Sequence, residues 1–282
     1  MPEMRLSGGT VEYEDTGGGG PVVVLVHGLV MNGTVWRKVV AELRGDHRCV
    51  VPTLPLGAHR LPMRPDCGLS PHRVAELLAE FVERLGAEDV TLVGNDIGLA
   101  QMVAAYHPRH IGRLVLTAQE AFDNYPPGLP GKVAELSGRL PGGLLMMSWL
   151  LRIRAFRRLP FTFGWMSKRP VPDEVFDGWV RPLRDPAIRR DLGAFMAAVT
   201  PDVMLRTAEA LPSFDRPALV VWAPEDRMNP REHGRRLAEL LPRGRLVEIP
   251  DSYMLIPEDQ PVRLARHIAE FTGARAATAD AP

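Results

Sequence analysis

The sequence predicts an α/β fold in which a mostly parallel sheet of about eight strands is flanked by helices and interrupted by a helical insertion. Short valine-rich runs alternate with segments of helical periodicity along most of the 282 residues, which is typical of a parallel sheet covered by helices. Residues 123–206 break this alternation and contain no valine-rich run. The chain length suits one large domain with such an insertion.

The first part of the chain supplies most of the expected strands. Its two N-terminal segments indicate a hairpin, and the all-apolar "PVVVLVHG" suits a strand that is buried on both faces of a parallel sheet. Helical periodicity lies around residues 36–43, over 74–85 after Ser70-Pro71, and over 98–106. The expected strand segments are, in order, "MRLSGG", "TVEYED", "PVVVLVHG", "HRCVVPTLPLG", "DVTLVGN" and "GRLVLTAQ".

Residues 123–206, here called the cap segment, are rich in proline and in helical stretches that carry methionine and aromatic side chains. We expect them to form a helical cap over the sheet. The stretch "LLMMSWLLRIRAFRRL" also has the composition of a basic amphipathic membrane helix. We favour the interpretation in which its apolar side roofs a pocket and its arginines face water.

After the cap segment, strands are expected at "RPALVVW" and "GRLVEIP", with a helix over 231–241 between them and a last helix from Glu258 to Phe271. No internal repeat is visible in the sequence. The chain therefore divides into a core of residues 1–122 and 207–274, a cap of residues 123–206, and a tail of residues 275–282 that we expect to be disordered.

The composition argues against several classes of function. Lys plus Arg and Asp plus Glu both number 34, so the chain has no net charge with which to attract nucleic acid. Cys49 and Cys67 make no disulfide framework, and the polar N-terminus lacks the apolar core of a signal peptide, so we expect a cytoplasmic protein. No apolar run is long enough to span a bilayer. We expect no metal or cofactor, and the sequence does not indicate an oligomeric state.

The stretch "TLVGNDIGLAQ" at residues 91–101 places a Gly-x-Asp-x-Gly turn between two apolar runs. In a large class of enzymes the central residue of such a strand-to-helix turn is the nucleophile. Gly94 and Gly98 remove side chains that would crowd the turn. Asp96 is therefore the candidate nucleophile, and the alternative is an exposed aspartate in an ordinary turn flanked by glycines.

Together with "VHG" after an early strand, "GNDIG", "APEDRMNP" and "IPDSYMLIPEDQP", this turn resembles the α/β-hydrolase superfamily along nearly the whole chain. An aspartate at the turn is similar to the haloalkane dehalogenase and epoxide hydrolase branch. The resemblance implies the α/β-hydrolase fold and an anion hole made by the backbone N–H groups of Leu29 and Ile97. It also implies that His27 shapes the loop that carries Leu29.

The resemblance further implies acidic partners for Asp96. Asp226 lies one loop beyond the strand "ALVVW", in the position of the third triad acid, and Glu120 follows "RLVLTAQ" in the alternative acid position of some dehalogenases. Each has a structural interpretation as well. Asp226 would then stabilise a helix N-terminus or a surface turn, and Glu120 would be a hinge residue held by backbone donors.

The catalytic histidine of the family is missing from its usual place. Alignment on "PEDQP" puts Met254 in that slot with Tyr253 before it, and no histidine occurs between residues 234 and 266. His233 and His267 do not fit the slot, and we expect both at the surface. Because Met254 cannot accept a proton and Tyr253 has a reference pKa near 10, cleavage of an alkyl-enzyme ester would lack its base.

Two further departures concern the parent reactions of the branch. Ile97 stands where dehalogenases of this type carry a halide-binding tryptophan. His27-Gly28-Leu29-Val30 stands where epoxide hydrolases of the family carry His-Gly-x-Pro. Both reactions are therefore in doubt for independent reasons.

Three functions remain open. The favoured one is an enzyme that uses Asp96, with its pKa raised by an apolar pocket, for acid/base chemistry on a small apolar molecule without an ester intermediate: elimination, decarboxylation, ring opening or cyclisation. The second is a hydrolase in which Glu120 or Asp226 activates a water positioned by Asn95 or Asn32. The third is a non-catalytic module that binds a small molecule.

We expect the pocket to lie between Asp96 and the cap segment, because ligand sites are mostly apolar and the cap segment concentrates aromatic and methionine residues. The residues expected to line it are His27, Trp36, Asn95, Tyr125, Trp149, Phe163, Trp165, Tyr253 and Met254.

Overall fold

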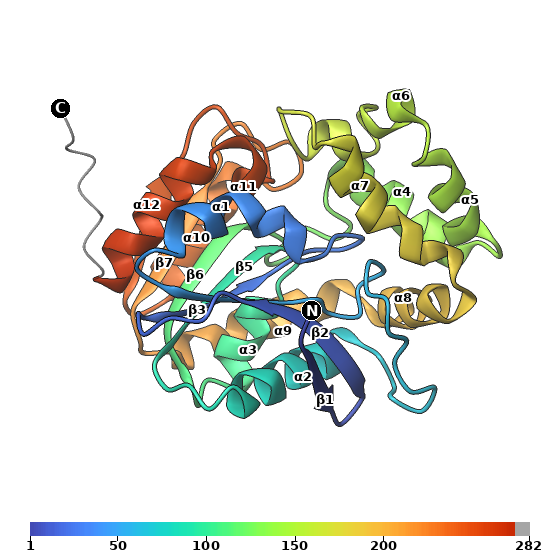
Figure 1. Cartoon of the computed structure of the whole chain (residues 1–282). Coiled ribbons are helices and arrows are strands. Elements are labelled where there is room, and N and C mark those ends of the chain that lie inside the picture. Colours follow the sequence, from blue (N-terminus) through green and yellow to red (C-terminus); the bar gives the residue numbers. More distant parts are fainter. Residues whose placement is uncertain (274–282) are drawn as a thin grey trace.

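The protein is described here by a computed structural model of residues 1–273. Its centre is one sheet in the order β1-β2-β4-β3-β5-β6-β7-β8 (Figure 1). The hairpin β1–β2 and the pair β2–β4 are antiparallel, and every pair from β4–β3 to β7–β8 is parallel. The expected fold class and eight strands are confirmed. The strands are β1 (Glu3–Leu6), β2 (Gly9–Asp15), β3 (Val22–Val26), β4 (Arg48–Pro52), β5 (Val90–Asp96), β6 (Ile111–Gln119), β7 (Ala218–Trp222) and β8 (Gly244–Glu248).

The central strands are buried on both faces, which explains their runs of valine and leucine. Every residue of β5 and β7 is buried. In β3, Val24 packs into one apolar cluster, whereas Val23 and Leu25 pack into the other on the opposite face. Because β5 lies in the middle of the parallel strands, its last residue, Asp96, is at the centre of the sheet edge where strands of this kind present ligand sites.

Helices cover the two faces of the sheet (Figure 1). On one face α1 (Arg37–Leu43), after the short η1 (Gly33–Trp36), packs against α12 (Pro261–Thr272). On the other face α2 (Pro71–Arg84) packs against α3 (Leu99–Tyr106). Ser70 begins α2 by accepting a hydrogen bond from the N–H of Arg73, as its place before Pro71 predicts. The expected last helix is divided into α11 (Ile256–Asp259) and α12, with Pro261 opening the latter. The remaining core helix is α10 (Arg231–Leu240).

Between β6 and β7 the described chain contains helices and no strand. Helices α4 to α7 lie at the end of the molecule farthest from α12 (Figure 1). The boundary expected at residue 206 is wrong, because it falls inside α9, which packs against α3 of the core. The elements are α4 (Gly128–Arg139), α5 (Gly143–Leu150), α6 (Arg154–Arg157), η2 (Phe163–Trp165), α7 (Asp173–Val180), η3 (Arg181–Arg184), α8 (Pro186–Ala198), α9 (Pro201–Ala210) and η4 (Leu211–Ser213).

The sequence also led to expectations about the C-terminal tail and about membrane-spanning segments. The tail expected at residues 275–282 lies outside the described residues. Within residues 1–273, no helix combines the length and the apolar character needed to cross a membrane.

Candidate active site

Asp96 occupies a strained turn at the end of β5. Its φ of 72° lies in the left-handed region, which is costly for a residue with a side chain and is typical of functional turns. A Cβ atom on Gly94 would come within 2.5 Å of the Cβ of Ala100 in the following helix, so the close approach of β5 and α3 requires glycine there. The Asp96 side chain is only 4% exposed, which excludes the interpretation as a solvent-exposed turn aspartate.

The loop after β3 holds one oxygen of this carboxyl group. The N–H of Leu29 donates to Oδ2 of Asp96 at 2.8 Å. His27 fixes the loop through two hydrogen bonds. Its Nε2 accepts a hydrogen bond from the N–H of Leu54 at 2.9 Å. The proton of the ring is therefore on Nδ1, which donates a hydrogen bond to the carbonyl oxygen of Gly28 at 2.9 Å. Burial lowers the pKa of His27 to about 4, so the ring is neutral. His27 does not line a cavity with Asp96, and its expected place in the pocket is wrong.

The two expected anion-hole donors are both engaged. Leu29 bonds to Asp96 itself, and the N–H of Ile97 donates to the carbonyl oxygen of Asn95 at 3.0 Å. The backbone groups expected to receive a developing negative charge are therefore present at the turn, but neither is free in this arrangement.

Glu120 is the immediate neighbour of Asp96. Its N–H donates to the Asp96 carbonyl oxygen at 2.8 Å, which places it at the end of β6 beside the turn. Both acids line the same cavity. Burial and then the charge of Asp96 raise the pKa of Glu120 well above its usual value. Burial raises the pKa of Asp96 to about 7, opposed by the bond from Leu29 and assisted by the charge of Asp226.

Asp226 completes a group of three buried or half-buried acids. Its oxygens accept from the N–H of Met228 at 2.8 Å and from Nδ2 of Asn229 at 3.0 Å. Burial raises its pKa to about 6 against the effect of these bonds. Asp226 lines neither cavity at the turn, although its charge acts on Asp96. Burial therefore favours the protonated form of Glu120, whereas Asp96, with a pKa of about 7, is partly ionised at neutral pH.

The slot of the missing histidine is filled by apolar core. Met254 is fully buried in the cluster that contains Val93 and Val115 and does not line a cavity. Asn95 lies between the strands and this loop, where its Nδ2 donates to the carbonyl oxygen of Met254 at 3.0 Å and to two carbonyl oxygens of β6. The expected places of Met254 and Asn95 in the pocket are wrong, because both belong to the packing beneath it.

The two histidines that do not fit the slot of the catalytic histidine, His233 and His267, line neither cavity beside Asp96. His267 is half-exposed, with Nδ1 3.6 Å from Glu270. His233 is not at the surface as expected. It is 8% exposed, and its ring packs edge-on against Phe122 with the centroids 5.2 Å apart. Neither ring lines a cavity with the acids.

The first cavity joins the two acids to the cap segment. Its volume is about 110 Å³, and Asp96 and Glu120 are the only ionisable side chains among the described residues that line it. The cap contributes apolar side chains from α5 and from the loop around η2, with Phe163 as expected. The apolar cap residues of the lining are Val133, Ala134, Met147, Leu151, Phe161, Phe163 and Met166.

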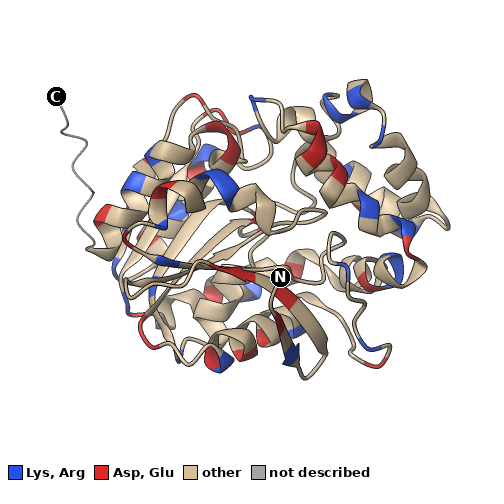
Figure 2. Ribbon diagram, viewed as in Figure 1, with Lys and Arg blue, Asp and Glu red and all other residues tan. Residues whose placement is uncertain are grey.

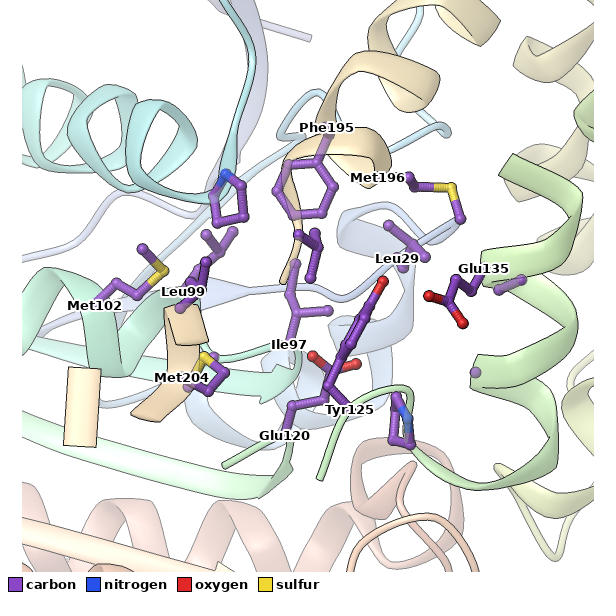
Figure 3. Close-up of a pocket in the computed structure, with 17 residues that line it drawn as sticks. Leu29, Ile97, Leu99, Met102, Glu120, Tyr125, Glu135, Phe195, Met196 and Met204 are labelled. Carbon is purple, nitrogen blue, oxygen red and sulfur yellow. The ribbon is translucent and has the colours of Figure 1, made fainter. Parts of the chain in front are cut away.

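The second cavity lies beside Glu120, between α3, α4, α8 and α9, and its volume is about 60 Å³ (Figure 3). Glu120 and Glu135 line it, whereas Asp96 does not. Leu29, Ile97 and Glu120 line both cavities. Tyr125 extends its ring into the second one (Figure 3), and burial raises the pKa of its hydroxyl to about 12. The other apolar side chains around it include Leu99, Met102, Phe195, Met196, Val199, Val203 and Met204.

Four of the expected aromatic residues lie elsewhere, and their assignment to the pocket is wrong. Trp36 is fully buried in the core. Trp149 is 57% exposed on the outer side of α5. Trp165 and Tyr253 stack under the guanidinium of Arg227, at 5.8 and 4.7 Å, outside both cavities.

The lining methionines and leucines were missed by the sequence analysis. Met147 and Leu151 are four residues apart and therefore share a helical face, a spacing that would have identified them. In the part of the chain that the structure describes, no group of three or more His, Cys, Asp and Glu side chains is arranged to hold a metal ion.

The chain is similar to known proteins in both sequence and structure. A family model described as "Alpha/beta hydrolase family" matches residues 23–267. The cis-3-alkyl-4-alkyloxetan-2-one decarboxylase of Xanthomonas campestris is 26% identical over 93% of this chain and 91% of its own. Haloalkane dehalogenase 2 of Mycobacterium tuberculosis is 25% identical over 95% and 93%. The crystal structure of a haloalkane dehalogenase loop variant from Bradyrhizobium elkanii superimposes with a TM-score of 0.75 at 18% identity, covering 96% of each chain.

Proposed function

Because the chain belongs to the alpha/beta hydrolase family, we propose that it is an enzyme that converts a small, largely apolar organic molecule through Asp96 without hydrolysis of an ester intermediate. The reaction is an elimination, decarboxylation, ring opening or cyclisation. One observation carries the proposal: Asp96 and Glu120 share an apolar cavity, and the described lining contains no histidine, lysine or arginine. The cavity thus offers an acid and a base without a separate group to activate water.

The two acids have complementary roles in this proposal. Asp96, with a pKa of about 7, is ionised for a large part of the population at neutral pH and is the proposed base that accepts a proton from the substrate. Glu120, whose pKa burial raises well above its usual value, is the proposed acid that donates a proton to the oxygen of a breaking bond. After a proton abstraction, transfer of one proton from Asp96 back to Glu120 restores the starting state, and no water is consumed.

The cap segment has the role of excluding solvent. Its apolar side chains line the cavity beside the acids, and water displaced by them and by a bound substrate would strengthen the electrostatic interactions of the remaining polar groups. The N–H of Leu29 orients one oxygen of Asp96, which leaves the other oxygen for the substrate.

The shape of the site indicates a substrate with two apolar arms. The two cavities share Leu29, Ile97 and Glu120 and lead apart from there, one toward α5 and the η2 loop and the other toward α3, α8 and α9. A reacting centre beside Asp96 and Glu120 would therefore carry an apolar substituent on each side. The name of the Xanthomonas decarboxylase describes such a compound, a four-membered lactone with an alkyl group on each of two ring carbons, and decarboxylation is among the reactions proposed here.

The hydrolytic alternative has less support from the geometry. Burial favours the protonated form of Glu120, and that form cannot act as a base for water. Asp226 lines neither cavity. Neither Asn95 nor Asn32 lines a cavity with the acids, so neither is placed to position a water there.

The proposed location is the cytoplasm. Cys49 and Cys67 are both buried and unpaired within the described chain, which supports a reducing compartment.

The test uses a cis-3-alkyl-4-alkyloxetan-2-one in water enriched in ¹⁸O, with analysis of the products by mass spectrometry. We expect an alkene and carbon dioxide, formed by cleavage of the C–O and C–C bonds of the ring, without an enzyme-dependent hydroxy acid. Asp96→Asn and Glu120→Gln should both reduce turnover. An ¹⁸O-labelled hydroxy acid as the main product would favour a hydrolase. Binding of the lactone without conversion, together with no reaction of haloalkane or epoxide probes, would favour a binding module.

A further inference from the structure

Exposed apolar side chains gather on the outer side of the cap segment. Of the eleven large apolar residues that are exposed in residues 1–273, six lie between residues 136 and 153. Single exposed apolar residues are ordinary on protein surfaces, but a contiguous group marks an interaction site. These residues, here called the outer cap patch, are Leu136, Leu140, Leu145, Met146, Trp149 and Ile153.

The patch arises from the two-sided character of α5 and the turn after it. Met147 and Leu151 face inward and line the first cavity. Trp149 and Ile153 face outward and are 57% and 55% exposed. Helix α4, which contributes Leu136, packs against α5. The stretch therefore buries one apolar face against the cavity and leaves a second apolar face without a partner in the described chain.

Basic residues are interspersed with this patch along the chain, and one of them, Arg152, lies against a patch residue. The cap segment holds 13 Lys and Arg against 8 Asp and Glu, although the whole chain is balanced at 34 of each. Lys132, Arg152 and Arg158 are exposed and form no ion pair among the described residues, and the guanidinium of Arg152 lies 4.8 Å from the centroid of the Trp149 ring. Figure 2 shows basic residues along α6, at the edge of the molecule.

Acidic groups reduce this charge without cancelling it. Glu135 pairs with Arg139, and Asp173 pairs with Arg154. Arg157 is buried between Asp173 and Asp177. Within residues 132–158, Lys132, Arg152 and Arg158 therefore keep an unpaired charge close in sequence to the apolar side chains, so the surface is suited to a partner that is apolar and carries negative charge.

We propose that the outer cap patch binds the surface of an anionic phospholipid membrane. Leucine, isoleucine, methionine and tryptophan side chains would enter the boundary between headgroups and acyl chains, while the arginines contact phosphates. A second copy of this chain is a poorer partner, because a two-fold contact would bring two basic patches together. The inference stands on the surface alone and does not depend on the chemistry of Asp96.

This placement gives the membrane a direct relation to the cavity. Helix α5 would separate the lipid from the apolar lining, with Trp149 on one side and Met147 on the other. An apolar substrate dissolved in the bilayer would then reach the site by passing the cap segment rather than through bulk water.

The test is co-sedimentation of the full chain with vesicles of phosphatidylglycerol and phosphatidylcholine, compared with vesicles of phosphatidylcholine alone. We expect binding to the anionic vesicles that weakens as salt is added, and little binding to the neutral ones. The double variants Trp149→Ser/Ile153→Ser and Arg152→Glu/Arg158→Glu should each lower the partition coefficient by at least about tenfold. Val262→Ser and Arg263→Glu, exposed on α12, are the matched controls and should bind like the wild type.

Two further measurements make the outcome decisive. Circular dichroism of the variants should be unchanged because every substituted side chain is exposed, and lipid-borne quenchers should reduce the fluorescence of the wild type more than that of Trp149→Phe. Equal binding to neutral vesicles, absence of binding to anionic vesicles, or unchanged binding of both double variants would overturn the proposal. So would light scattering that shows a dimer converted to a monomer by the patch variants, since a second copy would then cover the patch.

Discussion

The N–H of Glu120 donates to the carbonyl oxygen of Asp96 at 2.8 Å. This bond between the ends of two parallel strands brings two acids to one apolar cavity, where both have raised pKa values. The closeness of the two acids depends on the register of β5 and β6, because Asp96 pairs with Gln119 at the end of β6 and Glu120 is the next residue. Carboxyl groups in such a pair give up their protons in separate steps.

Turnover should depend on pH through Asp96. Because the ionised form is proposed to act, kcat should rise as pH increases through about 7 and fall only where Glu120 begins to lose its proton. In Glu120→Gln the side chain keeps its size and shape but cannot donate a proton as an acid, so kcat should fall by about 10²–10⁴-fold. Rate profiles between pH 5 and 9 for both proteins check this, and a wild-type rate independent of pH across 7 would contradict it.

The buried Asp96 should also lower stability at high pH. The pKa of Asp96 is about 7 in the folded protein and 3.8 for a solvent-exposed aspartate, so the folded state binds the proton more tightly. Stability therefore decreases as pH rises from about 4 to about 7, by on the order of 4 kcal/mol for this group. Asp96→Asn should abolish turnover and raise the melting temperature at pH 8 more than at pH 5. Equal shifts at both pH values would count against the buried charge.

Gly28 is expected to be intolerant of a side chain. A Cβ atom there would overlap the carboxyl group of Asp96, displacing it from the N–H of Leu29. Gly28→Ala should therefore lower kcat by at least about tenfold. Gly19→Ala is the matched control, since no atom lies within 4 Å of the Cβ position at that site. Steady-state kinetics of both variants distinguish a local clash from a general loss of stability.

Restoring the family histidine should not create a hydrolase. Met254 is fully buried among apolar side chains, so Met254→His would place a polar ring without a partner in the core, at a cost of about 1–3 kcal/mol. We expect a lower melting temperature and no gain in ester, epoxide or halide hydrolysis. Met254→Leu should be tolerated within about 1.5 kcal/mol. Hydrolytic turnover in the histidine variant would show that the slot still reaches the substrate.

The two apolar arms can be blocked one at a time. Met147→Trp should fill the first cavity and Met204→Trp the second. Each variant should therefore reduce kcat/KM most for substrates whose long alkyl group occupies the cavity that it fills. A series of lactones with one long and one short alkyl group, in both arrangements, provides the measurement. Met146→Trp, whose native side chain is 54% exposed, is the control. If both variants lowered kcat/KM equally for the two arrangements of the lactone, the two cavities would not bind the two alkyl groups separately.

Much of the fold follows from local sequence patterns. The valine-rich runs predict the strands because parallel strands are buried on both faces, and the glycines at 94 and 98 predict the tight turn at Asp96. The pairing order and the neighbouring positions of Asp96 and Glu120 arise only when β5 and β6 align. The raised pKa of Glu120 likewise results from burial by residues distant in the sequence.

The errors in the pocket have a specific cause in helix geometry. The sequence analysis chose Trp149 as a lining residue because it is aromatic and lies in the cap segment. Met147 is two residues away, about 200° around a helix, and therefore occupies the opposite face. Residue type alone does not reveal which face of α5 turns inward, since both faces are apolar. Met254 was placed by alignment, and alignment gives no information on the direction of a side chain.

If Asp96 is the base as proposed, the hydrogen bond from the N–H of Leu29 to its carboxylate would couple substrate binding to activation of that base. In the free protein this N–H holds Oδ2 and opposes the rise in the pKa of Asp96. A substrate oxygen that accepts the same N–H displaces the carboxylate, and Asp96 becomes a stronger base at that moment. Apolar molecules without such an oxygen leave the carboxylate restrained. The protein would thus discriminate among ligands by an exchange of one hydrogen bond, in addition to the fit of their apolar arms.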